Sequence, residues 1–134
     1  MLPETVTLHL PEALYRRLAN TARATQRSLE EVLLQAVRVG SPPAWEDAPP
    51  EFQSDLAEMD RLSDDDLWPI VRLQQSAAEV ARYDELLARN QAGPLADAER
   101  VELDGLRSAS ERLMLRKAHA AALLRWRGHA VPKP

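Results

Sequence analysis

The sequence contains no cysteine among its 134 residues, which excludes a disulfide framework and any metal site built on thiolates. It also lacks an uninterrupted apolar run of about 18 residues, the length that a membrane-spanning helix needs. The N-terminus does not have the basic and then apolar layout of a signal peptide. We therefore expect a soluble, cytoplasmic protein that makes no contact with a membrane.

Glycine is scarce, with four residues, whereas the ten prolines are distributed unevenly. Four of the prolines fall within residues 41–50, which read SPPAWEDAPP. Such a composition favours an extended, semi-stiff spacer over a helix. The sequence therefore predicts a unit over residues 1–40, a Pro-rich acidic linker over 41–63 and a second unit over 64–134.

The net charge of -4 conceals an uneven distribution along the chain. Residues 1–40 contain five basic and four acidic side chains, residues 41–67 one basic and nine acidic, and residues 68–134 eleven basic and eight acidic. An acidic total does not exclude binding to DNA, because the electrostatic footprint belongs to one face of a protein and not to its sum.

Residues 5–10 alternate between apolar and polar side chains, which predicts a half-buried strand. The apolar positions are Val6, Leu8 and Leu10, and the polar positions are Thr5, Thr7 and His9. A helix is predicted from Pro11 to about Thr25, and a second from the S-x-x-E capping box at Ser28 to Gly40. Because a lone short strand cannot satisfy its own hydrogen bonds, we expect two copies to pair in a homodimer.

The remainder of the chain predicts helices throughout. One helical turn or two are expected between Glu51 and Arg61. A long helix is predicted from about Asp65 to Ala92 and another from about Ala96 to Arg127, separated by Gly93-Pro94. Two long helices joined by a tight turn form an antiparallel hairpin. The predicted fold class is mainly α, with a strand and two helices at the N-terminus.

The N-terminal pattern resembles the ribbon-helix-helix family of bacterial repressors and antitoxins over residues 4–40. The resemblance is carried by VTLHLPE at 6–12, LYRRL at 14–18 and RSLEEVL at 27–33. It implies that paired strands enter the major groove of DNA, where three outward side chains read base edges. These are Thr5, Thr7 and His9. It also implies that a phosphate binds at the start of the second helix, at Arg27, Ser28 and Leu29.

These features together predict a dimeric DNA-binding regulator, the antitoxin of a toxin–antitoxin pair that represses its own operon. The contact with the toxin is assigned to apolar side chains spaced among the carboxylates of the linker. They are Trp45, Phe52, Leu56, Met59 and Leu62. The alternative is an interaction or scaffold protein, in which the N-terminal unit only dimerises and the helical hairpin binds a partner.

The remaining polar clusters predict neither an enzyme nor a bound cofactor or metal. The run Asp64-Asp65-Asp66 suits the start of a helix, and neither His119 nor His129 has a second ligand at a metal-binding spacing. No nucleophile motif, glycine-rich phosphate loop or catalytic carboxylate pair is present. From Arg112 to the end there are six basic and no acidic residues. That run could contact nucleic acid, an acidic partner or the chain's own acidic segment 46–66.

Overall fold

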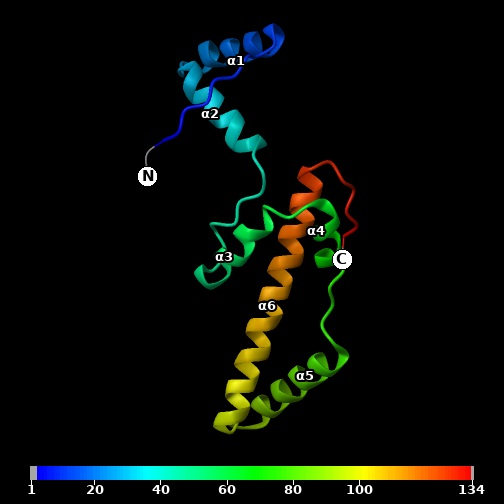
Figure 1. Cartoon of the computed structure of the whole chain (residues 1–134). Helices are drawn as coiled ribbons and strands as arrows, with labels where there is room; N and C mark the ends of the chain where they lie inside the picture. The colour runs from blue at the N-terminus through cyan, green and yellow to red at the C-terminus, as the bar shows by residue number, and fades with distance from the viewer. Residues whose placement is uncertain (1–2, 134) are drawn as a thin grey trace. The chain divides into compact units, whose positions relative to one another are not determined.

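A computed structural model describes residues 3–133, and every regular element within that range is an α-helix (Figure 1). The chain divides into an N-terminal unit, Met1–Ser41, and a C-terminal unit, Pro42–Pro134. The prediction of a mainly helical protein is confirmed. The ribbon-helix-helix fold class is wrong, because residues 3–133 contain no strand.

The predicted strand over residues 5–10 is replaced by a segment without regular structure, drawn in Figure 1 as an extended trace ahead of the first helix. The physical reason is that a strand exists only through ladder hydrogen bonds to a neighbouring strand. Alternating side chains indicate that an extended conformation is suitable, but they do not supply the neighbour. The rest of residues 3–133 is helical or irregular and provides none.

The N-terminal unit consists of two helices, α1 (Glu12–Thr25) and α2 (Leu29–Gly40). Pro11 precedes α1, and the Ser28 hydroxyl accepts a hydrogen bond of 3.1 Å from the Glu31 N–H at the start of α2. Between the helices the backbone passes through Gln26 in the left-handed conformation, with φ of 54°. The capping box and the proline thus place both helix starts close to where the sequence predicts them.

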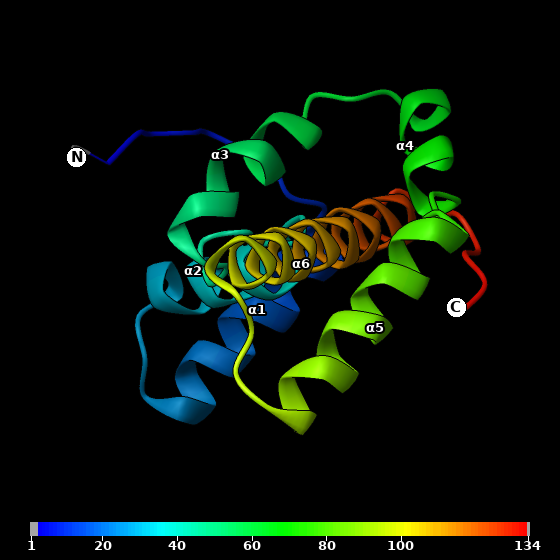
Figure 2. The same cartoon turned by 90° about the horizontal axis from the view of Figure 1, so that it is seen from below.

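The C-terminal unit contains four helices: α3 (Pro50–Met59), α4 (Asp64–Val71), α5 (Ala77–Ala92) and α6 (Asp97–Trp126). With 30 residues, α6 is about 45 Å long. Figure 2, seen nearly along α6, shows α3, α4 and α5 arranged around it. The helix α6 is therefore the central element on which the other three pack.

The long helix predicted up to Ala92 is two helices, α4 and α5, separated by residues 72–76. The Ser76 hydroxyl accepts a hydrogen bond of 3.1 Å from the Glu79 N–H and so caps α5. This is a second S-x-x-E capping box, and it provides a new helix start where a continuous helix was expected. The predicted hairpin is formed by α5 and α6, while α4 packs on α6 as a separate helix.

Two clusters of buried side chains hold the C-terminal unit together. The first lies where α3 and α4 meet α6 and contains Leu56, Met59, Leu67, Ile70, Ala120, Leu123 and Leu124. The second lies at the α5–α6 turn and contains Leu86, Leu95 and Leu103. On α5 the side chain of Leu86 is fully buried, whereas that of Val80 is 43% exposed.

The turn between α5 and α6 is further held by arginine–glutamate pairs. Arg82 donates two hydrogen bonds, of 2.7 and 2.8 Å, to the Glu102 carboxylate, and Arg89 pairs with Glu99. Residue 82 pairs with residue 102 and residue 89 with residue 99, as expected for two antiparallel helices.

No helix in the described range is both long and apolar enough to cross a membrane.

Candidate functional site

The N-terminal unit has very little core of its own. Within residues 3–41 the buried side chains are Ala22 and Val32. Several large apolar side chains are exposed instead, with Val6 at 78%, Leu8 at 70% and Val39 at 81%. A small unit gains its stability from the fraction of apolar surface that it buries. Two buried side chains make a small core for this unit, and its large apolar side chains remain exposed to solvent.

A groove of about 440 Å³ lies between α1 and α2. Mainly apolar residues of α1 and α2 line it: Leu18, Thr21, Val32, Gln35, Ala36, Val39 and Gly40. The groove adjoins Val32, one of the two buried side chains of the unit. It is thus an apolar depression continuous with the small existing core.

The three residues predicted to read DNA bases, Thr5, Thr7 and His9, all lie exposed on the extended segment before α1. They alternate with Val6 and Leu8, which are also exposed. In an extended backbone, successive side chains point to opposite sides. Polar and apolar side chains thus alternate along the segment, and both kinds are exposed.

The predicted phosphate-binding residues lie together at the start of α2. The Ser28 hydroxyl is occupied as the helix cap, and Leu29 is half-buried. The Arg27 guanidinium donates to the Gln35 side chain and lies 3.6 Å from the Glu31 carboxylate. Because Arg27 already has partners along α2, it must exchange them to reach a phosphate.

The five apolar residues predicted to bind a partner have a different role. Phe52, Leu56 and Met59 are buried at 1–3% exposure, on the side of α3 that packs on α6. Trp45 and Leu62 pack against the first cluster and are partly buried. These side chains are core residues of the C-terminal unit, so they are not presented to a partner while that unit is folded.

The basic run at the C-terminus contacts the chain's own acidic segment, one of the three alternatives that the sequence left open. Arg116 pairs with Asp55, and an Arg127 Nη atom lies 2.9 Å from Asp64 Oδ1. The His119 ring nitrogen Nε2 lies 2.9 Å from Asp60 Oδ1. These pairs fasten the second half of α6 to α3 and to the start of α4.

Asp64 contacts two side chains of this interface. Besides Arg127, its Oδ2 lies 2.6 Å from His129 Nε2. The hydrogen bond from Arg127, and secondly that from His129, hold the pKa of Asp64 below its ordinary value. The ring of His129 also stands edge-on to Trp68, with centroids 5.9 Å apart. The residues after α6 are thus tied to α4 by charge and by ring contact.

Asp60 receives two side chains from distant parts of the unit. Trp45 Nε1 donates to its Oδ2 at 3.0 Å, and His119 approaches its Oδ1. Two Asp–His pairs, Asp60–His119 and Asp64–His129, thus lie in this region. Residues 3–133 hold no group of three or more potential metal ligands. The arrangement joins the end of α3 and the start of α4 to α6 and to the residues that follow it.

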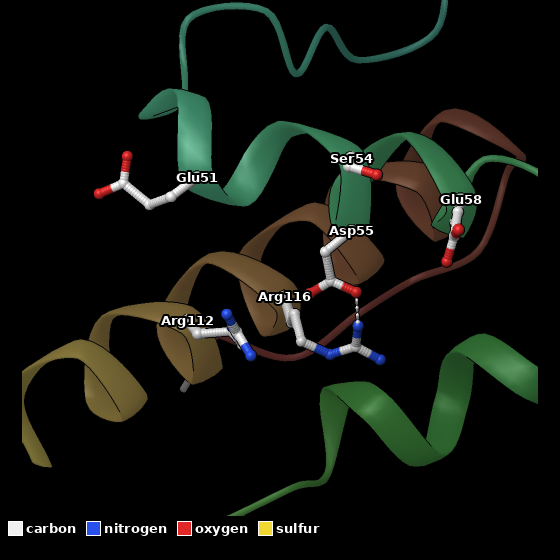
Figure 3. A pocket seen from close by; sticks show the side chains of 6 residues that line it. All are labelled: Glu51, Ser54, Asp55, Glu58, Arg112 and Arg116. Atoms are coloured by element: carbon white, nitrogen blue, oxygen red, sulfur yellow. Dashed lines mark hydrogen bonds and ion pairs between the residues drawn. The ribbon is translucent and has the colours of Figure 1, made fainter. Parts of the chain in front are cut away.

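An open cleft of about 420 Å³ lies between α3 and α6. Its lining residues are Glu51, Ser54, Asp55, Glu58, Arg112 and Arg116. Figure 3 shows Asp55 and Arg116 pointing toward one another inside it. The Arg112 guanidinium lies 5.7 Å from the centroid of the Phe52 ring. Since both signs of charge meet here, the cleft is a polar seam between two helices.

The residues of this seam recur at helical spacing in the sequence, although the sequence analysis did not predict the seam. Glu51, Asp55 and Glu58 recur at helical spacing on α3, and Arg112 and Arg116 recur at i, i+4 on α6. Such spacings put each set on one face of its helix.

No family model matches this chain, and neither a curated protein nor a solved structure matches it. The residues described above therefore carry the functional assignment.

Proposed function

We propose that this protein is a cytoplasmic, homodimeric DNA-binding regulator whose N-terminal unit dimerises and whose C-terminal unit holds a protein partner. The observation that carries the proposal is the uncovered apolar surface of the N-terminal unit, which adjoins a row of exposed polar side chains. The apolar surface suits a second copy of the chain, and the polar row suits the edges of bases.

Dimerisation follows from the energetics of the N-terminal unit. Burial of apolar surface contributes roughly 25 cal/mol per Å², and one copy leaves Val6, Leu8 and Val39 largely in water. A second copy carries the same apolar side chains and the same groove. A two-fold arrangement therefore covers both surfaces with one set of contacts.

Contact with DNA follows from the side chains that remain outside. Once Val6 and Leu8 are covered, Thr5, Thr7 and His9 face away from the dimer core. Threonine hydroxyls donate to or accept from base edges, threonine methyls contact the thymine methyl, and histidine donates to guanine acceptors. The start of α2 adds backbone N–H groups and Arg27 for a phosphate.

The direct test is fluorescence anisotropy with the DNA upstream of the protein's own gene. We expect Thr7→Ala combined with His9→Ala to weaken binding to this DNA about fivefold or more, consistent with the loss of about 1–3 kcal/mol of base contacts. Arg27→Ala weakens binding to all sequences and reduces the dependence of affinity on salt. Arg100→Ala, an exposed arginine of α6, is the matched control. Unchanged affinity in the double variant contradicts the assignment of the base-reading residues.

A second candidate is dimerisation without DNA binding, in which the helical unit serves as a scaffold for a partner. It is favoured by the nearly balanced charge of residues 1–40, with five basic and four acidic side chains. Two of these arginines, Arg16 and Arg27, already pair with glutamates. A stable dimer that binds no DNA even at low salt supports this candidate over the first.

We also propose that the partner of the C-terminal unit is a toxin encoded by the neighbouring gene, which makes the protein an antitoxin. Because Phe52, Leu56 and Met59 are core residues, the contact falls to exposed side chains of this unit, such as Val101 and Met114. Co-expression tests the role. A neighbouring gene product that inhibits growth alone and not with this protein is expected, and one that is harmless alone contradicts it.

A further inference from the structure

We propose that α4 carries a docking site for a partner segment that offers a cationic side chain and, two residues later, an aliphatic one. The chain's own residues 128–131, which we call the latch, occupy this site in the structure. The inference rests on the proposed role of the C-terminal unit in holding a protein partner. It names where that partner binds and what chemistry it offers.

The latch begins with a sharp turn at the end of α6. Gly128 adopts φ of 101°, and the His129 N–H donates to the Leu124 carbonyl at 3.0 Å. A left-handed glycine followed by this hydrogen bond is the Schellman ending of a helix, after which the chain takes a new direction. Figure 1 shows the segment after α6 turning back toward α4.

Two side chains of the latch, two residues apart, hold it in place. His129 Nε2 lies 2.6 Å from Asp64 Oδ2, and the imidazole ring stands edge-on to Trp68 with centroids 5.9 Å apart. Val131 is partly buried against the first apolar cluster. Ala130, which lies between them, is exposed. The site therefore receives one polar and one aliphatic side chain from alternate residues.

The core beneath the latch is held by contacts that do not involve the latch. The Arg127 guanidinium donates to Asp64 Oδ1 at 2.9 Å and to the Leu62 carbonyl at 2.8 Å, so it fixes the corner between α3 and α4. Leu67 of α4 is fully buried in the first cluster. Opening of the latch therefore leaves the helices in place and uncovers the second oxygen of Asp64 and the edge of Trp68.

The charge of the site decides which kind of partner it takes. Arg127 contacts Oδ1 of Asp64 and the latch contacts Oδ2, so Oδ2 becomes available when the latch opens. A carboxylate beside an indole ring attracts an ammonium, guanidinium or imidazolium group and repels a phosphate. The occupant is therefore a basic segment of a protein and not a nucleic acid. Its aliphatic side chain packs on the first cluster, as Val131 does.

The experiment uses the full chain and, as the probe, a peptide with the sequence of residues 128–133, GHAVPK. His129→Ser with Val131→Ser removes both side chains that hold the latch, and Ala130→Ser is the matched control in the same segment. Nuclear magnetic resonance follows the indole N–H signal of Trp68, which is assigned with Trp68→Phe. We expect the double variant to bind the peptide about tenfold or more tightly than wild type or Ala130→Ser, because an occupied site binds a competitor only in the open fraction of molecules.

Two results overturn the proposal. A double variant that keeps its helical circular dichroism signal, and whose Trp68 signal does not respond to the peptide, contradicts the docking site. Equal affinity in the double variant and in wild type contradicts occupation of the site by the latch. If the double variant loses its helices, Val131→Ser alone takes its place and is judged by the same two results. A peptide with serine in place of both His129 and Val131 should bind none of the chains.

This test and the test of the proposed partner fail separately. If co-expression neutralises the neighbouring gene product but the double variant binds no peptide, the partner role stands and the docking site is wrong. If the peptide binds as expected but the neighbouring gene product is harmless alone, the docking site stands and the toxin assignment is wrong.

Discussion

At the scale of single residues, Asp64 shows how the acidic segment contacts the chain's own basic residues. Its carboxylate accepts from Arg127 and contacts His129, and both hold its pKa below the ordinary value of 3.8. A carboxyl whose pKa is lower in the folded state stabilises that state above the ordinary pKa. The contribution is lost as the pH falls through the lower, folded pKa.

Asp64→Asn is therefore expected to reduce the free energy of unfolding of the C-terminal unit at pH 7. The deficit relative to wild type should shrink at low pH, as the pH falls below 3.8 and through the lower, folded pKa of Asp64, where both states of the wild-type carboxyl bind the proton. Urea unfolding followed by tryptophan fluorescence at both pH values measures it. Asp65→Asn, at the exposed neighbouring position, is the matched control. An Asp64→Asn deficit that is equal at both pH values contradicts the role given to the ion pairs.

Gln26 is a second residue whose backbone conformation has a measurable effect on the free energy of unfolding. It adopts φ of 54° at the end of α1, a left-handed conformation that costs a side chain about 1–2 kcal/mol and that glycine adopts freely. We expect Gln26→Gly to stabilise the N-terminal unit by about 1 kcal/mol. Ala24→Gly, in the last turn of α1, should destabilise it by up to about 1 kcal/mol. Thermal unfolding at fixed concentration compares them, and a destabilised Gln26→Gly would contradict the strain argument.

At the scale of elements, local signals predicted helix starts and ends better than they predicted what covers a helix. Pro11, the Ser28 capping box and Gly40 place α1 and α2 near their observed bounds. The apolar face of α3 was also visible in the sequence, but periodicity does not say whether a face meets a partner or the chain's own α6. The covering element lies some 60 residues away, beyond the reach of any local pattern.

The break between α4 and α5 was missed although its signal was present. Ser76 and Glu79 form the same capping box as Ser28 and Glu31. Apolar residues at helical spacing continue across 72–76 and favoured one long helix. The strand prediction over residues 5–10 was wrong for a different reason. The alternation of apolar and polar residues was clear, but residues 3–133 provide no neighbouring strand for the ladder hydrogen bonds.

Ser76→Ala is expected to fray the start of α5 at a local cost of about 1 kcal/mol, because the Glu79 N–H loses its acceptor. Amide hydrogen exchange across Ala77–Val80 should accelerate roughly five- to tenfold. Ser108→Ala, at an exposed position in the middle of α6, is the control. Equal exchange rates in wild type and Ser76→Ala would show that the cap does not hold this helix end.

At the scale of the whole molecule, the two units differ in how they are stabilised. The C-terminal unit has two apolar clusters and a set of ion pairs between distant segments. The N-terminal unit has two buried side chains and depends, in our account, on a second copy. The sequence suggested this dependence on a second copy, because a single short strand lacks a hydrogen-bonding neighbour within its own chain. The small core of the N-terminal unit leads to the same proposal.

Thermal unfolding of the full chain should therefore show two transitions. The transition of the N-terminal unit should move to higher temperature as protein concentration rises, because dimerisation stabilises only the associated state. The transition of the C-terminal unit should not depend on concentration. Calorimetry over a hundredfold range of concentration measures both. A single transition independent of concentration contradicts the division of stability between the units.

The central claim is that a second copy completes the N-terminal unit. Its most direct test is the mass of the full-length chain in solution, measured by light scattering over a range of concentrations. We predict twice the chain mass of 15.0 kDa, falling toward one chain mass only on dilution and with loss of helical signal. A mass of 15.0 kDa at every concentration, with the helices of the N-terminal unit intact, would contradict the account.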